Sequence, residues 1–474
     1  MPDFDEATTA AAAPRDHYRD LLARLDQVGG DELADRARLL DSIFRSLGIT
    51  FAVYDDERGA ERTWPMDLVP RIIPADEWRH LEAGLVQRVT ALNRFLDDLY
   101  VGDQAALHDG VVPRWLVESA DGYSREAYGI PAPAGARCVV AGIDIVRDGE
   151  GTYRVLEDNL RVPSGISYVL ENRVAMTRVL PVAFARHRVR PVNHYGSALL
   201  RALRAAAPPA SGEPTVVVLT PGTANSAYFE HAFLARQMGV ELVEGRDLTV
   251  EDHVVYMRTT RGLERVDVVY RRVGDEFLDP AVFRSDSLLG VPGIVSAARA
   301  GNVTLANALG NGAADDKGIY PFVPDLIEYY LGAEPILPNV TTYLPWEADQ
   351  LETVLDRLDQ LVVKPVAEAG GYGIVIGHEA SDEELGRVAE ALRADPRGYI
   401  AQEVVRLSTH PTLVDGELRP RHIDLRPFVL SSPAGVEVIP GGLTRVALPE
   451  GSLIVNSSRG GGSKDTWVLA GDGA

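Results

Sequence analysis

The chain has 474 residues, which is too long for one ordinary domain and favours two or three packed units. Hydrophobic residues make up 46% and charged residues 24%, a balance typical of globular proteins that excludes a disordered, collagen-like or coiled-coil chain. Because 47 Lys and Arg face 69 Asp and Glu, the net charge is -22, and this field repels phosphate backbones and anionic membranes, so we expect neither nucleic acid nor a membrane as a partner.

The first residues of the chain, 1–14, are rich in Ala, Thr and Asp. They offer little apolar surface to offset the entropy of ordering, so we predict that they are disordered. They also lack the basic start and apolar run of a signal peptide, and no stretch elsewhere is long and apolar enough to span a bilayer. These features predict a cytoplasmic protein.

Residues 15–205 are predicted to form a mainly helical N-terminal region with a β-hairpin. Apolar residues recur at helical spacing in 33–48, which ends at Gly48, and in 76–100, while 49–56 has the pattern of a strand. In 137–159, two apolar runs flank a Gly/Asp turn, as in a hairpin. The single cysteine, Cys138, lies in the first run and excludes an internal disulfide; we expect a buried structural thiol.

A Pro/Ala/Gly/Ser linker at 204–214 precedes a predicted βαβ unit over 212–290. Residues 215–222 have the pattern of a buried parallel strand, 225–239 of a helix closed by glycine, and 240–245 of the next strand. Two more strands around a turn are predicted in 256–273.

Residues 291–474 begin with helices and glycine-containing loops. An amphipathic helix (349–360) leads into a strand, a glycine-rich turn and another strand (361–377). The remaining predicted strands alternate with turns, which implies an antiparallel sheet: 399–405, 421–430, 436–448 and 452–458. No fixed repeat, coiled coil or long apolar surface helix indicates an interface between subunits, and the oligomeric state stays open.

The strongest local signal for a binding site is Lys364 followed by Gly370, Gly371 and Gly373, between two predicted strands. A lysine at a strand end can neutralise a phosphate, and a glycine-rich turn lets backbone N–H groups close over the anion. The segment is not a Walker loop, because no Gly-x-x-x-x-Gly-Lys-Ser/Thr motif opens a helix here. An ordinary hairpin with glycine at its turn fits the same residues.

A second signal is the strand 399–405, where Gln402 and Glu403 interrupt an apolar run. An adenine ring needs a flat apolar slot and a few edge hydrogen bonds, which the backbone from Gln402 to Val404 could supply. Polar residues at the end of an edge strand are the alternative interpretation.

A third signal is the acidic end of the predicted hairpin. The alternation of a strand puts Glu157 and Asn159 on one face and Asp158 on the other. Asp144, on the first strand, shares the face of Glu157 if the strands pair in the appropriate register. Two carboxylates and a carboxamide suit Mg²⁺, which is commonly completed by nucleotide phosphates. A solvated hairpin face is the alternative.

Together these motifs resemble the nucleotide site of the ATP-grasp enzymes, in which two α+β lobes clamp ATP. Here Glu157-x-Asn159 precedes the lysine instead of following it, so the chain is similar to the circularly permuted ATP-grasp family and, in fold, to the ATP-grasp part of glutathionylspermidine synthase. The resemblance extends from about residue 41 to 468 and is carried by 157–173, 220–239 and 456–469. It implies an α+β, circularly permuted ATP-grasp fold with a βαβ (pre-ATP-grasp-like) unit and an N-terminal helical region.

The resemblance also implies roles for individual residues. Lys317 and Lys364 match the phosphate-binding lysines, the three glycines match the loop over the phosphates, and Gln402, Glu403 and Val404 match the adenine hinge. Asp144, Glu157 and Asn159 match the Mg²⁺ ligands. Arg426 matches the arginine that faces the γ-phosphate and the developing acyl phosphate, and Arg161 would share that work as a second catalytic residue. Residues assigned to the substrate cleft are Asn225, Arg271, Arg272, Asn456, Ser458 and Arg459, with only one of the two adjacent arginines expected to face the site.

The resemblance implies an ATP- and Mg²⁺-dependent carboxylate–amine ligase, acting through an acyl phosphate on small-molecule or peptide acids and amines. Such chemistry needs no side-chain nucleophile, because the amine is held beside the activated acid. Two alternatives stay open: a phosphotransferase of the same fold acting on a hydroxyl, and a nucleotide-binding scaffold without turnover.

Overall fold

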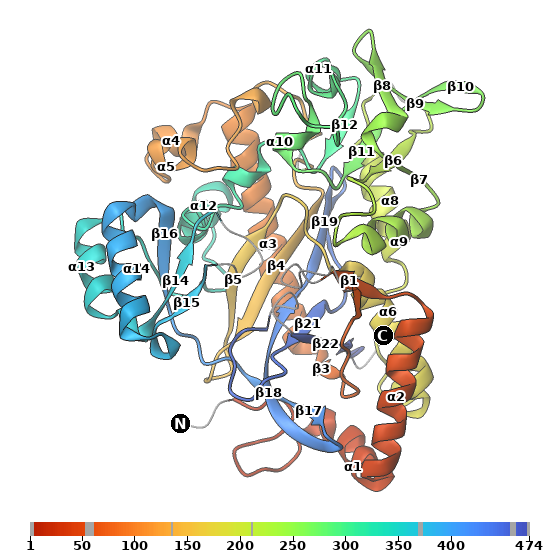
Figure 1. Cartoon of the computed structure of the whole chain (residues 1–474), viewed down its shortest axis with the longest axis vertical. Helices are drawn as coiled ribbons and strands as arrows, with labels where there is room; N and C mark the ends of the chain where they lie inside the picture. The colour runs from red at the N-terminus through yellow and green to blue at the C-terminus, as the bar shows by residue number, and fades with distance from the viewer. Residues whose placement is uncertain are drawn as a thin grey trace.

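The computed structural model describes residues 4–52, 61–133, 136–209, 212–367, 373–455 and 461–471. An eight-stranded sheet lies at its centre, in the order β20-β19-β4-β18-β21-β22, with β5 paired to β4 and β17 paired to β18 (Figure 1). Its pairings are antiparallel, as expected for the C-terminal strands. The strands are β4 (Val140–Arg147), β5 (Tyr153–Asn159), β17 (Thr409–Val414), β18 (Glu417–Arg426), β19 (Phe428–Ser432), β20 (Gly435–Val438), β21 (Leu443–Val446) and β22 (Gly462–Lys464).

The hairpin β4–β5 from the first third of the chain is inserted among strands from the last part. Strand β4 lies between β18 and β19, with Ile145 paired to Leu425 and Gly142 paired to Phe428. The tertiary contact that the permuted order requires is therefore present. The predicted regions 15–205 and 291–474 share this one sheet.

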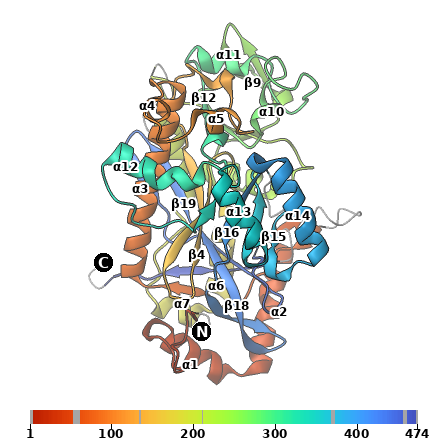
Figure 2. The same cartoon turned by 90° about the vertical axis from the view of Figure 1, so that its left-hand side faces the viewer.

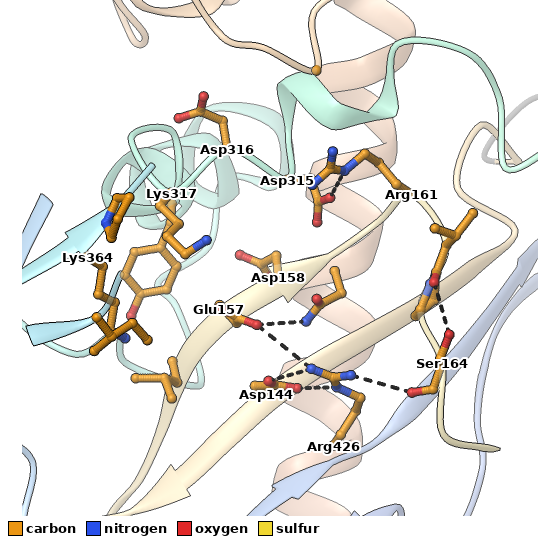
Figure 3. A pocket seen from close by; sticks show the side chains of 18 of the residues that line it. Asp144, Glu157, Asp158, Arg161, Ser164, Asp315, Asp316, Lys317, Lys364 and Arg426 are labelled. Carbon is orange, nitrogen blue, oxygen red and sulfur yellow. Dashed lines mark hydrogen bonds and ion pairs between the residues drawn. The ribbon is translucent and has the colours of Figure 1, made fainter. Parts of the chain in front are cut away.

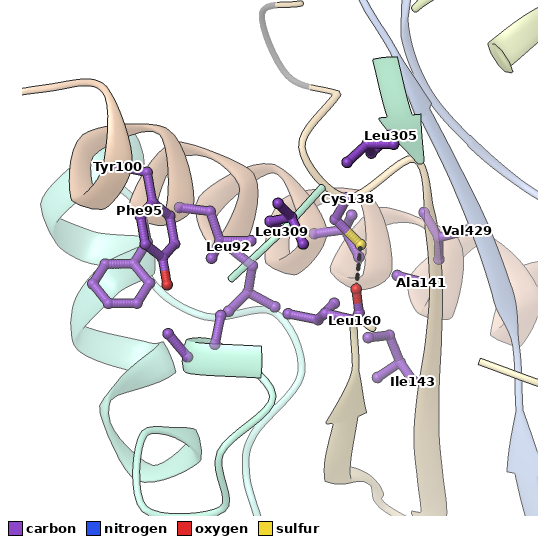
Figure 4. Packing of buried hydrophobic residues seen from close by; sticks show 14 of the residues in the cluster. Leu92, Phe95, Tyr100, Cys138, Ala141, Ile143, Leu160, Leu305, Leu309 and Val429 are labelled. Carbon is purple, nitrogen blue, oxygen red and sulfur yellow. Dashed lines mark hydrogen bonds between the residues drawn. The ribbon is translucent and has the colours of Figure 1, made fainter. Parts of the chain in front are cut away.

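Helix α3 (Ala75–Tyr100) covers one face of the central sheet and packs on β19 and β20 (Figure 2). Its helical repeat buries an apolar stripe that includes Trp78, Leu85 and Leu92. Cys138 lies in this core between the helix and the sheet (Figure 4), where its Sγ donates to Val140 O at 3.3 Å and burial raises the pKa of the thiol. The prediction of a buried structural thiol is confirmed.

A parallel sheet in the order β12-β11-β6-β7 forms beside the central sheet, from β6 (Val216–Leu219), β7 (Glu241–Val243), β11 (Val268–Arg271) and β12 (Thr304–Ala306). The predicted βαβ unit is confirmed: β6, α9 (Tyr228–Met238) and β7 follow one another, and Gly239 ends the helix at a φ of 69°. Residues 256–273 differ from the prediction, because β9 (Val254–Thr259) pairs with β8 (Leu248–Glu251) and β10 (Gly262–Arg265), whereas β11 joins the parallel sheet.

A separate four-stranded antiparallel sheet with two helices forms the small lobe, which we define as residues 342–367 and 373–403. Its strands follow the order β13-β16-β14-β15: β13 (Thr342–Tyr343), β14 (Leu361–Pro365), β15 (Val375–Ile376) and β16 (Tyr399–Glu403). Helices α13 (Ala348–Asp356) and α14 (Asp382–Ala394) complete it, and Leu361, Val363 and Leu392 form its core. The strand–turn–strand prediction for 361–377 agrees with β14 and β15.

The remaining helices surround these sheets: α1 (Arg19–Val28), α2 (Gly30–Ser46), α4 (Ala105–His108), α5 (Arg114–Glu118), α6 (Ile166–Val179), α7 (Pro181–Arg186), α8 (Tyr195–Ala205), α10 (Asp275–Leu278), α11 (Ile294–Arg299) and α12 (Val323–Leu331). Two short strand pairs are antiparallel β1 (Thr50–Ala52) with β2 (Glu61–Thr63) and parallel β3 (Arg71–Ile73) with β23 (Thr466–Val468). Within the described ranges, no helix has the length and apolarity needed to cross a bilayer.

The N-terminus differs from the prediction of disorder, because Asp5 bridges to Thr409 of β17 and the Glu6 N–H donates to Thr409 O at 3.0 Å. Glu6 is buried and its carboxylate accepts from Arg71 Nε at 2.7 Å and from Ser408 Oγ at 2.6 Å. These partners lie 65 and 402 residues away in the sequence, so composition alone could not reveal them. The predicted strand 452–458 is also absent over 452–455, and its last three residues lie outside the described ranges.

Candidate active site

A cavity of 920 Å³ opens between the central sheet, the small lobe and the loops at the end of the parallel sheet. Figure 3 shows Lys317, Lys364, Glu157, Asp144 and Arg426 around this cavity. The first two come from the loop before α12 and from β14, and the others come from the central sheet. Residues that are far apart in sequence therefore meet at one site.

The hairpin β4–β5 supplies the acidic side of the cavity. Asp144 and Glu157 are direct cross-strand partners, and Asn159 pairs with Gly142 on the same face of the hairpin. The Asn159 Nδ2 group donates to Glu157 Oε1 at 3.4 Å. Strands β4 and β5 therefore pair in the register that puts Asp144 and Glu157 on one face. A bulge lies between Asp144 and Ile145.

Asp158 points to the opposite side of β5, as the alternation predicts. Its two carboxylate oxygens accept from Arg88 Nε and Nη2 on α3, each at 2.6 Å, and both side chains are almost fully buried. Arg88 Nη1 also donates to Asn339 Oδ1 at 2.8 Å. This bidentate pair attaches the hairpin to α3, while the neighbouring Glu157 faces the cavity.

Two arginines surround Asp144. Its carboxylate accepts from Arg426 Nε, from Arg426 Nη2 at 2.7 Å and from Arg445 Nη2 at 2.7 Å. Burial opposes ionisation of Asp144, but the charges of Arg426 and Arg445 outweigh it and hold the pKa of this carboxyl below its usual range. Asp144 is therefore an anion at neutral pH.

Glu157 has the opposite tendency. Burial and the charge of Asp144 raise the pKa of its carboxyl, against the opposing charges of Lys317, Arg426 and Lys364. Arg426 Nη2 lies 3.8 Å from Glu157 Oε1, so this guanidinium reaches both carboxylates. The carboxylates of the hairpin therefore face the ammonium groups of Lys364, in the small lobe, and of Lys317.

Lys364 is buried at the cavity end of β14 and donates to Gln402 Oε1 at 2.5 Å. Burial lowers the pKa of Lys364 to about 8, with Glu157 opposing the shift and Lys317 adding to it. The same Gln402 side chain donates from Nε2 to Thr342 Oγ1 at 3.0 Å. Gln402 therefore orients the lysine, a role that the sequence did not suggest.

The predicted adenine hinge borders an apolar part of the cavity, lined by Leu156, Ile376, Ile400, Val405 and Leu453. Gln402, Glu403 and Val404 also line it. The Glu403 carboxylate accepts from Tyr343 OH at 2.6 Å and from Arg357 Nη2 at 3.0 Å. The backbone N–H of Glu403 donates to Thr341 O at 3.0 Å. A planar ligand would thus meet aliphatic side chains together with the backbone of this strand end.

Arg161 lines the cavity and is ion-paired with Asp315, whose other oxygen accepts from the Leu160 N–H at 2.9 Å. This pair joins the end of the hairpin to the loop that carries Lys317. Arg426 and Arg161 therefore both border the cavity, each bound to a carboxylate.

The two arginines predicted near the substrate are buried and bonded to the protein itself. Arg271 donates to Asn307 O, Val273 O and Ala308 O at 2.7–3.0 Å and pairs with Asp275. Arg272 donates to the carbonyls and hydroxyl of the 162–164 loop and lies 3.4 Å from Glu230. Arg271 is among the residues that line the cavity, and a substrate contact by either arginine stays a prediction.

Asn225 caps its own turn, because its Oδ1 accepts from the Ala227 N–H at 2.9 Å; its neighbours Ser226 and Ala227 line the cavity. Gly373 follows the glycine-rich turn at a φ of 69°, and a Cβ there would lie 2.7 Å from Pro365 Cγ. Five predicted site residues lie outside the described ranges: Gly370, Gly371, Asn456, Ser458 and Arg459.

Arg445 and Asp424 also belong to this site, although no sequence motif pointed to them. Arg445 Nε donates to Asp424 Oδ1 at 2.9 Å while its Nη2 bonds Asp144, so the pair supports the acidic hairpin from the next strands. The sequence does contain one indication for Asp424, because it precedes Arg426 by two residues on the same strand and therefore shares its face. The register that brings Arg445 opposite Asp424 is a property of the tertiary structure.

The fold is that of the ATP-grasp proteins. The chain belongs to the circularly permuted ATP-grasp type 2 family, whose model matches residues 70–447. A solved glutathione synthetase-like effector from Globodera pallida has the same fold, with a TM-score of 0.57 and 12% identity over 92% of this chain and 96% of that one.

Similar sequences include an "Uncharacterized protein" of Mycobacterium tuberculosis (58% identical, 98% of this chain and 84% of the relative) and one of Synechocystis (54%, 99% and 97%). A Frankia alni protein called "Putative glutamate--cysteine ligase 2-3" is 49% identical over 98% of this chain. This chain spans 54% of the length of that relative, so its name describes a protein almost twice as long.

Proposed function

We propose that the protein is an ATP- and Mg²⁺-dependent carboxylate–amine ligase. A substrate carboxylate attacks the γ-phosphate of ATP, giving an acyl phosphate and ADP; an amine then attacks the acyl carbon, forming an amide and releasing phosphate. The observation that carries the proposal is the meeting of Lys317 and Lys364 with the Asp144–Glu157–Asn159 face around one cavity. Family membership supports the same reaction class.

The cavity suits a nucleotide in two parts. The apolar slot beside the 402–404 strand end would accept adenine, and the two lysines would neutralise phosphates that extend from it toward the hairpin. Arg426, at the far side of Glu157, would stabilise negative charge on the reacting carboxylate, and Arg161 would assist from the other rim. These roles use only donors and charges that already border the cavity.

The donor set fits Mg²⁺ completed by phosphates. A carboxylate has about four acceptor positions, and three N–H donors occupy the Asp144 carboxylate, leaving room for one further ligand. Glu157 and Asn159 lie beside it. Among the described residues, no group of three or more His, Cys, Asp and Glu is arranged to hold a metal, so the proposed ion would need phosphates and water as its other ligands. When bound, Mg²⁺ would neutralise phosphate charge.

The substrates we propose are small-molecule or peptide acids and amines, in keeping with the ligase name of the Frankia relative. A cytoplasmic location, where ATP is available, is part of the proposal. The cavity has room for an acid beside the nucleotide, because its lining also includes Ser164, Tyr168 and Trp64. We therefore place the acid at this end of the cavity.

The reaction class can be tested with hydroxylamine as the amine. Incubation with ATP, Mg²⁺ and a panel of amino acids and short peptides, glutamate included, should yield a hydroxamate and an equal amount of ADP. A stable phosphoester without hydroxamate would indicate a phosphotransferase, and the absence of acid-dependent ADP across the panel would argue against ligase activity.

The pH dependence of nucleotide affinity follows from Lys364. Bound phosphates favour the protonated amine of Lys364, whereas in the protein without nucleotide burial lowers the pKa of this side chain to about 8. Binding above pH 8 must therefore take up a proton, so the affinity for Mg·ADP should fall as pH rises through 8. Calorimetric titration in two buffers at pH 8.5 should register uptake of up to about three quarters of a proton per nucleotide. The Lys364→Arg variant should lose this uptake; equal uptake in both proteins would exclude Lys364 as its source.

A further inference from the structure

Arg397 connects the small lobe to two segments outside it. It lies in the 3₁₀ turn Pro396–Gly398, directly before β16. Its Nη2 donates to Asp316 Oδ2 at 2.9 Å and to Leu116 O at 3.2 Å, and its Nε donates to Ser119 Oγ at 2.9 Å. One guanidinium therefore joins the small lobe to the end of α5 and to the residue before Lys317.

Asp316 fixes the backbone around Lys317. Its Oδ1 accepts from the Gly318 N–H at 2.7 Å, so the side chain closes an Asx turn that has Lys317 at its centre. The Asp316 side chain is 5% exposed, and its second oxygen accepts from Arg397. Figure 3 shows Asp316 next to Lys317 at the edge of the cavity. Arg397 thus contacts the carboxylate that shapes the turn of a predicted phosphate-binding lysine.

The surroundings of Arg397 are tightly packed. Its guanidinium carbon lies 5.7 Å from the centre of the Trp346 ring, and Trp346 meets Trp115 of α5 edge to face at 5.8 Å. A Cβ on Gly318 would lie 2.9 Å from Asp316 Oδ1, 3.1 Å from Trp346 and 3.2 Å from Arg397. The Arg397–Asp316 contact therefore leaves little space around Gly318, and the Trp115–Trp346 pair lies beside it.

We propose that Arg397 is a positioning residue for nucleotide binding, which acts through Asp316 and sets the distance between Lys317 and Lys364. The inference rests on the proposed function, because it assumes that both lysines hold phosphates. Lys364 is carried by the small lobe and Lys317 by the loop outside it, so two cations that must grip one anion belong to different parts of the fold. Arg397 holds these parts together, because it is part of the small lobe and binds the Lys317 turn.

The test compares Arg397→Gln with Arg393→Gln, which makes the same change on the exposed end of α14. Calorimetry with Mg·ADP should give a dissociation constant about tenfold higher for Arg397→Gln, the scale of one lost hydrogen bond to a charged group. Arg393→Gln should bind like the parent protein. Thermal unfolding of both variants checks that the fold is retained.

A double-variant cycle separates positioning from general support of the fold. If Arg397 acts through Asp316, then Asp316→Asn should weaken nucleotide binding, and the double variant should lose much less than the product of the two single effects. Ser119→Ala removes one of the two Arg397 contacts at the end of α5, leaves the Asp316 contact intact and should have a small effect. If the double variant loses as much affinity as the product of the two single losses, Arg397 does not act through Asp316 and the proposal is overturned.

Tryptophan fluorescence gives a second readout of nucleotide binding, separate from calorimetry. Mg·ADP should change the emission of the parent protein through the Trp115–Trp346 contact, and Trp115→Phe should reduce this change. Arg397→Gln should need more nucleotide for the same change. If Arg397→Gln binds normally while Lys317→Met does not, the positioning role is wrong and the proposed function stands; if the parent protein binds no nucleotide, the proposed function itself fails.

Discussion

Replacing Glu157 by glutamine should reduce ATP turnover roughly 100-fold to 1000-fold, the range measured when one charge-stabilising group is removed from an active site. The amide keeps the size of the side chain but removes the negative charge that faces Lys317, Lys364 and the proposed Mg²⁺. The rate of ADP formation at saturating ATP is the measurement. A variant as fast as the parent protein would remove Glu157 from the proposed metal site.

Stability should respond in the opposite direction to the same change. Burial and Asp144 raise the pKa of Glu157, so its ionised form costs the fold free energy, and the neutral amide should leave the melting temperature unchanged or slightly higher. Glu150→Gln, in the exposed turn of the same hairpin, is the matched control and should alter neither property. A clear loss of stability in Glu157→Gln would mean that the lost turnover reports folding.

Replacing Arg88 by methionine should lower the free energy of unfolding by about 3–5 kcal/mol, since it leaves Asp158 buried without its bidentate partner. Chemical denaturation measures this change. Asp158, which loses its partner, is the neighbour of Glu157 on the opposite face of β5. Arg88→Met therefore tests the face of β5 that packs on α3, whereas Glu157→Gln tests the face that borders the cavity.

Two further variants test why Arg88→Met should lower the free energy of unfolding. Arg79→Met alters an exposed arginine on the same helix α3 and should change stability by less than about 0.5 kcal/mol. Combining Arg88→Met with Asp158→Leu removes both charges and should recover most of the stability, because no buried charge is left unpaired. If the double variant is as unstable as Arg88→Met, packing around α3 rather than the ion pair holds the hairpin.

Elements defined by local periodicity were predictable. The run 215–222 became β6, the repeat in 225–239 became α9, and Gly239 ended that helix because it lacks a Cβ and adopts a positive φ. The alternation along β5 likewise put Glu157 and Asp158 on opposite faces. Each of these features depends on neighbours within a few residues, and the sequence carries that information directly.

The resemblance of the motifs predicted the family and the fold, and the cavity gathers Lys317, Lys364, Asp144, Glu157 and Asn159 as that resemblance implied. The roles of these residues toward ATP and Mg²⁺ stay predictions. The permuted order also predicted that an early hairpin must join late strands, which β4 does between β18 and β19. The sequence alone could state this requirement but could not establish the pairing.

Only the tertiary structure decided which charges pair. Arg426 and Asp144 lie 282 residues apart, and their contact depends on the order and register of three strands, which are fixed by burial on both faces of the sheet. The ordering of the N-terminus by Arg71 and the link from Arg397 to Asp316 have the same origin. Local patterns encode helices, strands and turns because their interactions span a few residues, whereas the partner of a buried charge is set by the whole sheet.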